Sequence, residues 1–349
     1  IFDSTSSNAE TLRKAKSMNL LVPTLLFTLD AFSSASAWLT TSPSVATRVV
    51  KPSLERSMAS KSAQKIASRS KWTASRGVTN DDVISEGQKE TGFCTIIGNG
   101  RIGSLLAKGG ESLVLKRGDS IPKDNEGTPI LIATRNDSLE GIIVDCPENR
   151  LKDLVFLQNG YLDNFLRENG LSNNSQALLF FSVASMDAEP VDGITSVNPE
   201  GLTAVTGVHA EAFANRLLAL NLKCNVVNNE DYRPAMFEKL IWICTYMLVG
   251  SAKECTSVGQ AGADHSDIVK KLVEELKAAV TSNEGIVFPD GTMDRLAAYT
   301  DVVKDFPCAV KEFKWRNEYF YNMGDDACPL HNRLLKECKE KSLLGFNLP

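Results

Sequence analysis

The segment FCTIIGNGRIGSLLAKGGESLVLKRGD, residues 93–119, restricts the possible folds more than any other. A short apolar run is followed by three glycines with the spacing G-x-G-x-x-G, then by a helix-like run and a second apolar run. In a strand–turn–helix unit such glycines permit a tight turn, close approach of a pyrophosphate, and close packing of helix on sheet. The N–H groups at the start of the helix then face the phosphates. The residues expected at this dinucleotide site are Gly98, Asn99, Gly100, Arg101, Ile102 and Gly103.

The end of the second apolar run indicates which dinucleotide is bound. NAD sites usually have an acidic residue about 20 residues after the first glycine, where it binds the ribose 2′-hydroxyl. Here Lys116 and Arg117 occupy that place. Two cations suit a 2′-phosphate, so the expected cofactor is NADP. Asp119 is the competing acid, but it lies two residues further on, and an incidental basic pair beside a glycine-rich turn is the alternative.

The chain after residue 92 alternates strand-like and helix-like segments. Strands are expected at 93–97, 112–116, 129–134, 153–158 and 176–183, and helices at 101–109, 138–145 and 161–169. Apolar strands separated by short helices predict a parallel sheet covered on both faces, an α/β doubly wound fold of the Rossmann type. A helix near 209–220 and a strand near 223–228 give weaker signals.

The pattern becomes helical after Arg233 and Pro234. Helices are expected at 235–258, 264–283, 289–303 and 308–323, with breaks that contain Gly, Pro and Asp. The sequence therefore predicts an NADP-binding Rossmann domain at 92–230 and an all-helical C-terminal domain at 231–349.

Charge and cysteine usage exclude several classes of function. Residues 1–76 contain 11 of the 38 Lys and Arg residues and 4 of the 43 Asp and Glu residues, so the remaining 27 basic and 39 acidic residues give a net charge of −12. An acidic body argues against nucleic acid or an anionic membrane as partner. The eight cysteines are scattered without a C-x-x-C motif, which indicates reduced thiols. The three histidines lie far apart, so no metal site is expected and each is interpreted as a surface or helix-end residue.

The N-terminal region has the composition of a targeting sequence. Residues 18–37 contain an apolar run and end in Ala-Ser-Ala, as in a signal peptide, and residues 38–76 are rich in Ser, Thr, Ala, Lys and Arg, as in a transit peptide. Together they resemble the bipartite presequence of algae with complex plastids, so chloroplast stroma is the expected location. We expect 1–17 to be an upstream translated segment and 77–91 a linker. A secreted or anchored protein with a disordered stalk is the alternative.

Four motifs resemble the ketopantoate reductase (2-dehydropantoate 2-reductase) family. They are GNGRIG with the basic KRG after the second strand, VFLQNGYLDN at 155–164, RPAMFEKLIW at 233–242, and EFKWRNEYFYNMG at 312–324 followed by CPLHNRLL. The resemblance covers about 93–335. It implies a reductase that transfers hydride from NADPH to a small keto acid. It also implies helical domains that pair into a homodimer; docking to a plastid complex is the other partner expected.

The resemblance also implies roles for individual residues. Lys239 matches the catalytic lysine of the family, Glu312 the substrate-binding glutamate, and Asn159 an asparagine near cofactor and substrate. Arg135 stands where the family usually has a cofactor-binding lysine. A lysine in the cleft stabilises the negative charge that develops on the ketone oxygen and supplies the proton. The apolar surroundings of Lys239 in the sequence are expected to lower its pKa. A snorkelling surface lysine and a solvated Glu312 are the alternatives.

Two departures from the family pattern affect the expected substrate. Ile243 and Met247 occupy the positions, four and eight residues after the lysine, where the family carries substrate-binding asparagines. Only about a dozen residues separate the second and third strands, whereas the family has a longer connecting segment there. These changes predict a less polar 2-oxo acid or ketone as substrate. The alternative is a catalytically inactive NADP-binding relative that acts as a regulatory or structural subunit in the plastid.

Overall fold

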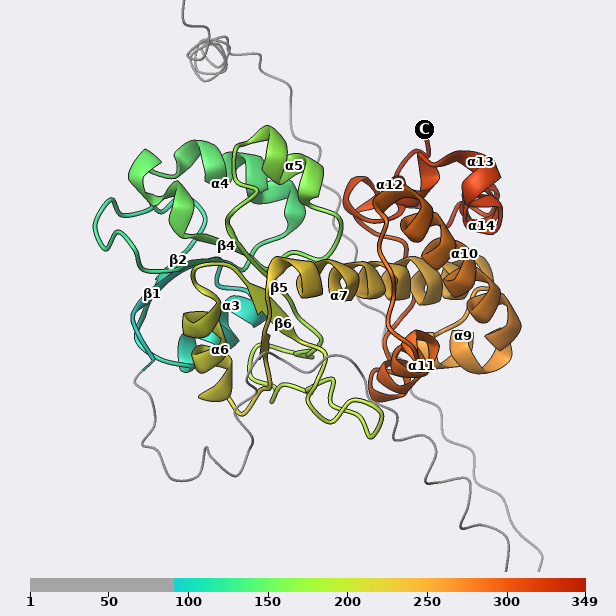
Figure 1. Cartoon of the computed structure of the whole chain (residues 1–349), viewed down its shortest axis with the longest axis horizontal. Helices are drawn as coiled ribbons and strands as arrows, with labels where there is room; N and C mark the ends of the chain where they lie inside the picture. The colour runs from blue at the N-terminus through green and yellow to red at the C-terminus, as the bar shows by residue number, and fades with distance from the viewer. Residues whose placement is uncertain (1–90) are drawn as a thin grey trace, which may run out of the picture. The chain divides into compact units, whose positions relative to one another are not determined.

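The computed structural model of the protein describes residues 91–349 (Figure 1). The upstream segment, the signal and transit segments and all of the linker except Thr91 lie outside the described residues, so those expectations stay predictions.

A mostly parallel seven-stranded sheet forms the first part of the described chain. Its strands are β1 (Cys94–Ile97), β2 (Ser112–Leu115), β3 (Ile130–Ile132), β4 (Leu154–Phe156), β5 (Ser175–Leu178), β6 (Ala204–Thr206) and β7 (Asn225–Val226), in the order β2-β1-β3-β4-β5-β6-β7. All neighbouring pairs are parallel except β5 and β6. This arrangement confirms the predicted α/β fold class. The antiparallel β6 was not predicted, because three residues are too few to give a periodic signal.

Short helices cover both faces of the sheet, as apolar parallel strands require. Their bounds are α3 (Arg101–Lys108), α4 (Leu139–Asp145), α5 (Asp163–Glu168) and α6 (Ala210–Leu218), with 3-10 turns η2 (Asn136–Ser138) and η3 (Glu148–Asp153). Side chains of α3 and α6 pack in one apolar cluster with β1, β5 and β6, whereas those of α4 and α5 pack in another with β3 and β4. Figure 1 shows α3 and α6 on the side of the sheet away from α4 and α5.

Strand β2 is the edge of the sheet, because the short connection after it contains no strand. Arg150 and Asp153 hold this connection in place. Arg150 is fully buried, donates hydrogen bonds to the carbonyls of Pro122 and Thr128 at 3.1 Å, and pairs with the Asp153 carboxylate at 2.7 Å. The connection between β2 and β3 is therefore short, as the sequence indicates.

Helices make up the rest of the chain. They are α7 (Asn229–Trp242), the π-helical turn η4 (Ile243–Met247), α8 (Leu248–Ala252), α9 (Val258–Asp264), α10 (Ser266–Glu284), α11 (Thr292–Val302), the 3-10 turn η5 (Phe313–Trp315), α12 (Asn317–Tyr321), α13 (Gly324–Ala327) and α14 (Pro329–Glu340). Figure 1 shows α7 leading from the sheet into this helical part.

Two helix predictions were wrong in position. Helix α7 begins at Asn229 and not after Pro234, because the side chain of Asn228 caps it by accepting a hydrogen bond from the backbone N–H of Asp231 at 2.8 Å. The helix expected at 308–323 is broken, because Glu312 adopts a left-handed conformation with φ 51°. Only the short turns η5 and α12 form there.

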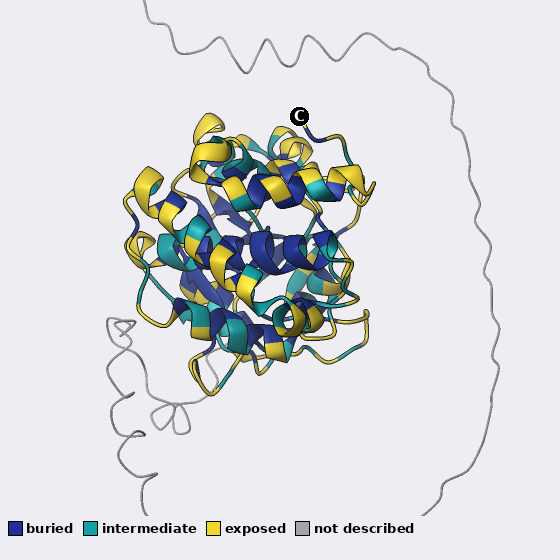
Figure 2. Ribbon diagram, turned by 90° about the vertical axis from the view of Figure 1, so that its right-hand side faces the viewer, coloured by how far each residue is buried: buried dark blue, intermediate teal, exposed yellow. Residues whose placement is uncertain are grey.

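The continuous helical stretch Asn229–Ala252 is long and apolar enough to cross a membrane, but 83% of its most apolar window is buried inside the protein. Figure 2 shows buried residues along interior helices and exposed residues on the outer ones. The stretch therefore serves as the core helix of the helical part.

The cysteine prediction agrees with the described part of the chain. All eight cysteines are free thiols, and no group of three or more potential metal ligands occurs within residues 91–349. His331 differs from the surface alternative. It lies in the first turn of α14 but is fully buried, with ring nitrogens 2.9 Å from Asn332 Oδ1 and 3.0 Å from Asn317 Oδ1.

Candidate functional site

The glycine turn after β1 has the geometry that its sequence predicts. Gly98 has φ 105°, and a Cβ there would lie 2.7 Å from the carbonyl oxygen of Ala133. A Cβ on Gly103 would lie 1.8 Å from the carbonyl oxygen of Gly98, so helix α3 packs directly against the turn. A Cβ on Gly100 would meet no atom within 4 Å. The turn thus has open space at its middle glycine, where a bound pyrophosphate would approach, and it fits a dinucleotide.

The charged residues expected around the cofactor lie in different places. Lys116 and Arg117 are exposed directly after β2, and the Asp119 carboxylate accepts a hydrogen bond from the Lys116 backbone N–H at 2.7 Å. Arg101 points elsewhere, because its Nη1 donates to the carbonyls of Val183 and Ala184. Its guanidinium therefore fastens α3 to the segment after β5.

The remaining predicted cofactor residues differ in exposure. Asn99 is exposed in the turn, Ile102 packs against the apolar cluster below α3, and Arg135 is exposed and pairs with Asp137 at 3.1 Å. Arg135 therefore lies on the surface beyond β3. Its role in cofactor binding stays a prediction.

Gln158 connects the glycine turn with a pocket at the carboxyl ends of the strands. Its Nε2 donates to the carbonyls of Ile132 at 2.8 Å and Thr134 at 3.2 Å, and Thr134 in turn packs against Gly98. Asn136, buried beside it, donates to the carbonyl of Asn159 at 3.1 Å. The carboxyl ends of β1, β3 and β4 are thereby held together, which is where doubly wound folds bind ligands.

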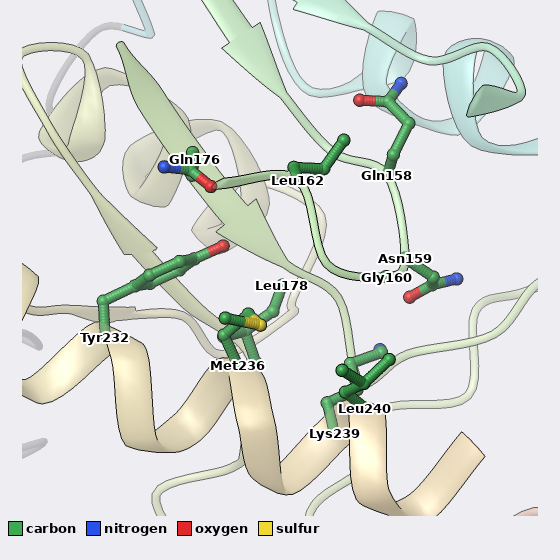
Figure 3. Close-up of a pocket in the computed structure, with 10 residues that line it drawn as sticks. All are labelled: Gln158, Asn159, Gly160, Leu162, Gln176, Leu178, Tyr232, Met236, Lys239 and Leu240. Carbon is green, nitrogen blue, oxygen red and sulfur yellow. The ribbon is translucent and has the colours of Figure 1, made fainter. Parts of the chain in front are cut away.

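The pocket lies between the sheet and helix α7 (Figure 3). Tyr232, Met236, Lys239 and Leu240 extend into it from α7, and Gln158, Asn159, Gly160, Leu162, Gln176 and Leu178 line it from the sheet side. Its volume is about 10 Å³, roughly the space that one water molecule needs. A keto acid does not fit into this space, so substrate binding requires side chains or helices around it to move.

Lys239 is the one buried lysine in the described part of the chain. It is 7% exposed, its Nζ donates to the carbonyl of Leu179, and it lies 4.3 Å from the centre of the Phe180 ring. Burial, together with the nearby positive charge of Arg316, lowers the pKa of Lys239 to about 7. The snorkelling alternative is therefore wrong, and the expected direction of the pKa shift is confirmed.

Glu312 and Arg316 form a second charged group beside this pocket. Arg316 Nη2 is paired with the Glu312 carboxylate, and the two side chains are 15% and 18% exposed. The carbonyl of Trp315, between them in sequence, accepts a hydrogen bond from the backbone N–H of Tyr161 at 2.7 Å, next to the pocket residue Gly160. Glu312 is thus a partly buried, ion-paired carboxylate, unlike the solvated alternative.

The π-helical turn changes which residues follow Lys239 on its helix face. Ile243 lies one α-helical turn after Lys239, because its backbone N–H reaches the Lys239 carbonyl. The π-helical turn is wider than an α-helical turn, so residues after Ile243 do not keep the α-helical spacing from Lys239. Ile243 and Leu248 are apolar and buried. Neither Ile243 nor Met247 is among the residues that line the pocket, so the expected loss of polar groups from the substrate site stays a prediction.

Three functional candidates were missed in the sequence. Gln158 belongs to a motif that had been recognised, so its place after β4 was a usable signal. Arg316 also lies within a recognised motif, four residues after Glu312, so its spacing was a usable signal too. Asn136 gave no signal, because its position depends on a contact with Asn159, 23 residues further along the chain.

Comparisons with known proteins show which fold this architecture belongs to. No protein-family model and no curated protein matches the sequence. Solved structures do match. One is 2-dehydropantoate 2-reductase from Methylococcus capsulatus, at 14% identity and TM-score 0.52, with 73% of this chain and 99% of that chain covered. The fold is that of the ketopantoate reductases.

Two further solved structures share the fold. D-mandelate dehydrogenase, solved with NADH and anilino(oxo)acetate, matches at 13% identity and TM-score 0.52, covering 72% of this chain and 99% of that one. The dimeric ketopantoate reductase from Staphylococcus aureus matches at 15% identity and TM-score 0.50, covering 71% and 98%. Each of these proteins has its whole length represented in this chain.

Proposed function

We propose that this chain is an NADPH-dependent reductase of a 2-oxo acid or related ketone, similar to ketopantoate reductase but with an altered substrate pocket. The observation that carries the proposal is Lys239, buried at the carboxyl edge of the sheet with a pKa of about 7. The glycine turn contacts the same pocket through Thr134 and Gln158. Membership in the ketopantoate reductase family is part of the proposal.

Gly98, Gly100 and Gly103 would hold a nicotinamide cofactor, which would supply the hydride to the ketone carbon. Negative charge then develops on the ketone oxygen, and the Lys239 ammonium group stabilises that charge and donates the proton. The proton returns to the lysine from solvent. A lysine pKa near 7 suits this role, because general acids work best when their pKa lies near the working pH. Asn159 and Glu312 are proposed to orient the substrate.

NADPH is proposed as the cofactor because Lys116 and Arg117 are exposed after β2, where the adenosine ribose of a dinucleotide lies. The shared fold does not itself choose between the two nicotinamide cofactors, since D-mandelate dehydrogenase was solved with NADH.

Domain division, assembly and location are proposed from the sequence. Residues 92–230 are the cofactor domain and 231–349 the substrate and dimerisation domain. The chain is proposed to form a homodimer in the plastid stroma; light scattering that finds a monomer would contradict the dimer. A fluorescent protein fused to residues 1–76 that stays outside the plastid of such an alga would contradict the location.

The proposed activity is tested by NADPH oxidation with a panel of 2-oxo acids. We expect turnover with NADPH, weaker turnover with NADH, and a loss of at least about 100-fold in Lys239→Ala. The wild-type rate should fall as pH rises through about 7, because the lysine then loses the proton that it donates. Equal rates in wild type and Lys239→Ala would remove the lysine from the mechanism.

A catalytically inactive NADP-binding subunit is the second candidate, favoured by the small volume of the pocket. It predicts NADPH binding, measured by fluorescence enhancement, without oxidation of NADPH by any acid in the panel.

A further inference from the structure

The Arg316 side chain carries an N–H donor that has no hydrogen-bond acceptor within the described residues. One terminal nitrogen, Nη2, is paired with Glu312, but Nε is buried and has no partner within the described residues. A buried N–H group without an acceptor is costly, so such groups usually have a partner. The pairing with Glu312 holds the guanidinium in one orientation. Arg316 is therefore positioned to receive a further acceptor.

The surroundings of Arg316 place it beside the Lys239 pocket. It directly follows Trp315, whose carbonyl oxygen would lie 2.2 Å from a Cβ at the pocket residue Gly160. Its positive charge contributes to the low pKa of Lys239. Burial raises the pKa of Cys244, and the charge of Arg316 opposes that rise. Arg316 thus lies near enough to this helix for its charge to act on both Lys239 and Cys244.

A 2-oxo acid carries two adjacent acceptor groups, a ketone oxygen and a carboxylate, that two neighbouring cationic side chains can bind. Its ketone oxygen and its carboxylate are on adjacent carbons, so the groups that bind them must lie close together. A guanidinium binds a carboxylate with two parallel hydrogen bonds, which a lysine does not do. The Glu312 carboxylate is paired with Arg316, and Ile243 and Leu248, which follow Lys239 on its helix, are apolar and buried. These residues therefore offer no free group to bind a side-chain hydroxyl.

We propose that Arg316 binds the carboxylate of the substrate while Lys239 faces the ketone oxygen, and that the substrate is a 2-oxo acid with an apolar side chain. This rests on the proposed reductase function. Glu312 then orients the substrate through Arg316, as a positioning residue that holds the guanidinium. The apolar helix face beyond Lys239 contacts the substrate side chain.

The first test compares an acid with its ester. The full-length protein is assayed with 2-oxo-4-methylpentanoate and with its methyl ester, in wild type, Arg316→Met and Arg316→Lys. We expect Arg316→Met to raise KM for the acid on the order of 100-fold, with no rise for the ester. Arg316→Lys should recover part of the lost affinity for the acid, because lysine keeps the positive charge but cannot form two parallel hydrogen bonds to a carboxylate. Lys314→Met, an exposed change two residues away, is the matched control.

The outcomes separate this proposal from the proposed function. Equal effects of Arg316→Met on acid and ester, or no effect on either, would overturn the role of Arg316 while the reductase stands. A better rate with the hydroxylated 2-oxo-4-hydroxy-3,3-dimethylbutanoate than with the apolar acid would overturn the proposed substrate class.

If the wild-type protein reduces neither compound, that result contradicts the proposed reductase activity. Arg316 is then tested by a binding measurement instead. Calorimetry with the unreactive carboxylate N-isobutyloxamate, in the presence of NADP, then tests Arg316 directly. Binding that is lost in Arg316→Met supports the carboxylate site. Absent binding to wild type, or equal binding to both proteins, overturns it.

Discussion

Adjacent residues in one helix take opposite roles in this protein. Lys239 faces the pocket beneath the sheet, whereas Glu238 faces away and forms a buried ion pair with Arg295 at 2.8 Å. Because Glu238 is committed to Arg295, it does not neutralise Lys239. The lysine therefore remains a buried cation whose ammonium group contacts a carbonyl and an aromatic ring, with the positive charge of Arg316 nearby. Such a group is unfavourable for folding whenever it is charged.

The buried charge of Lys239 predicts a pH-dependent gain in stability when it is removed. The folded pKa of about 7 lies below the reference value of 10.5, so the destabilisation is complete below pH 7 and fades between pH 7 and 10.5. Lys239→Met should therefore raise the free energy of unfolding more at pH 6 than at pH 9.5, by about 3 kcal/mol. Urea unfolding at the two pH values measures the difference. Lys270→Met, an exposed change, is the control, and the same pH dependence there would contradict the explanation.

At the level of elements, the glycines of the strand–turn–helix unit differ in their surroundings. Gly103 has the Gly98 carbonyl against it, whereas the space above Gly100 is open. Gly100 also has φ −74°, which an alanine adopts without strain. The third glycine is therefore needed for folding, and the second is needed only if a ligand fills the open space.

This difference predicts opposite behaviour for two alanine variants. Gly103→Ala should lower the free energy of unfolding by about 2 kcal/mol or more through overpacking. Gly100→Ala should leave stability unchanged but weaken NADPH binding on the order of tenfold or more, because its methyl group occupies the place of the pyrophosphate. Urea unfolding and NADPH fluorescence titration measure the two effects. Full NADPH affinity in a folded Gly100→Ala protein would show that the turn does not hold the cofactor.

On the scale of the whole molecule, polar side chains buried between elements hold the fold together. Arg216 on α6 donates to four carbonyls near α3 and β2, including that of Glu111 at 2.7 Å. Glu238 and Arg295 connect α7 with α11 in the same way. Removing one member of such a buried pair leaves the other charge without compensation. These contacts determine how the long helix α7 is held against its neighbours.

The pair between α7 and α11 gives a stability prediction. Glu238→Gln should lower the free energy of unfolding by about 3 kcal/mol, because Arg295 stays buried and charged. The double variant Glu238→Met/Arg295→Met should regain most of that loss. Urea unfolding measures both, and the exposed pair Lys336–Asp325 provides the control, whose disruption should change stability little. A double variant as unstable as the single one would indicate that packing, and not charge, is decisive.

The sequence by itself determined the glycine turn, the parallel sheet, the exposed cations after β2 and the existence of a helical second part. These features depend on residue spacing within one or two neighbouring elements, which the chain shows directly. Only the tertiary structure decided that β6 runs antiparallel, that Glu312 leaves the helical conformation, and that Arg316 comes to lie beside Lys239. These features, like the ion pair between Glu238 and Arg295, depend on segments far apart in the chain, so no local pattern encodes them.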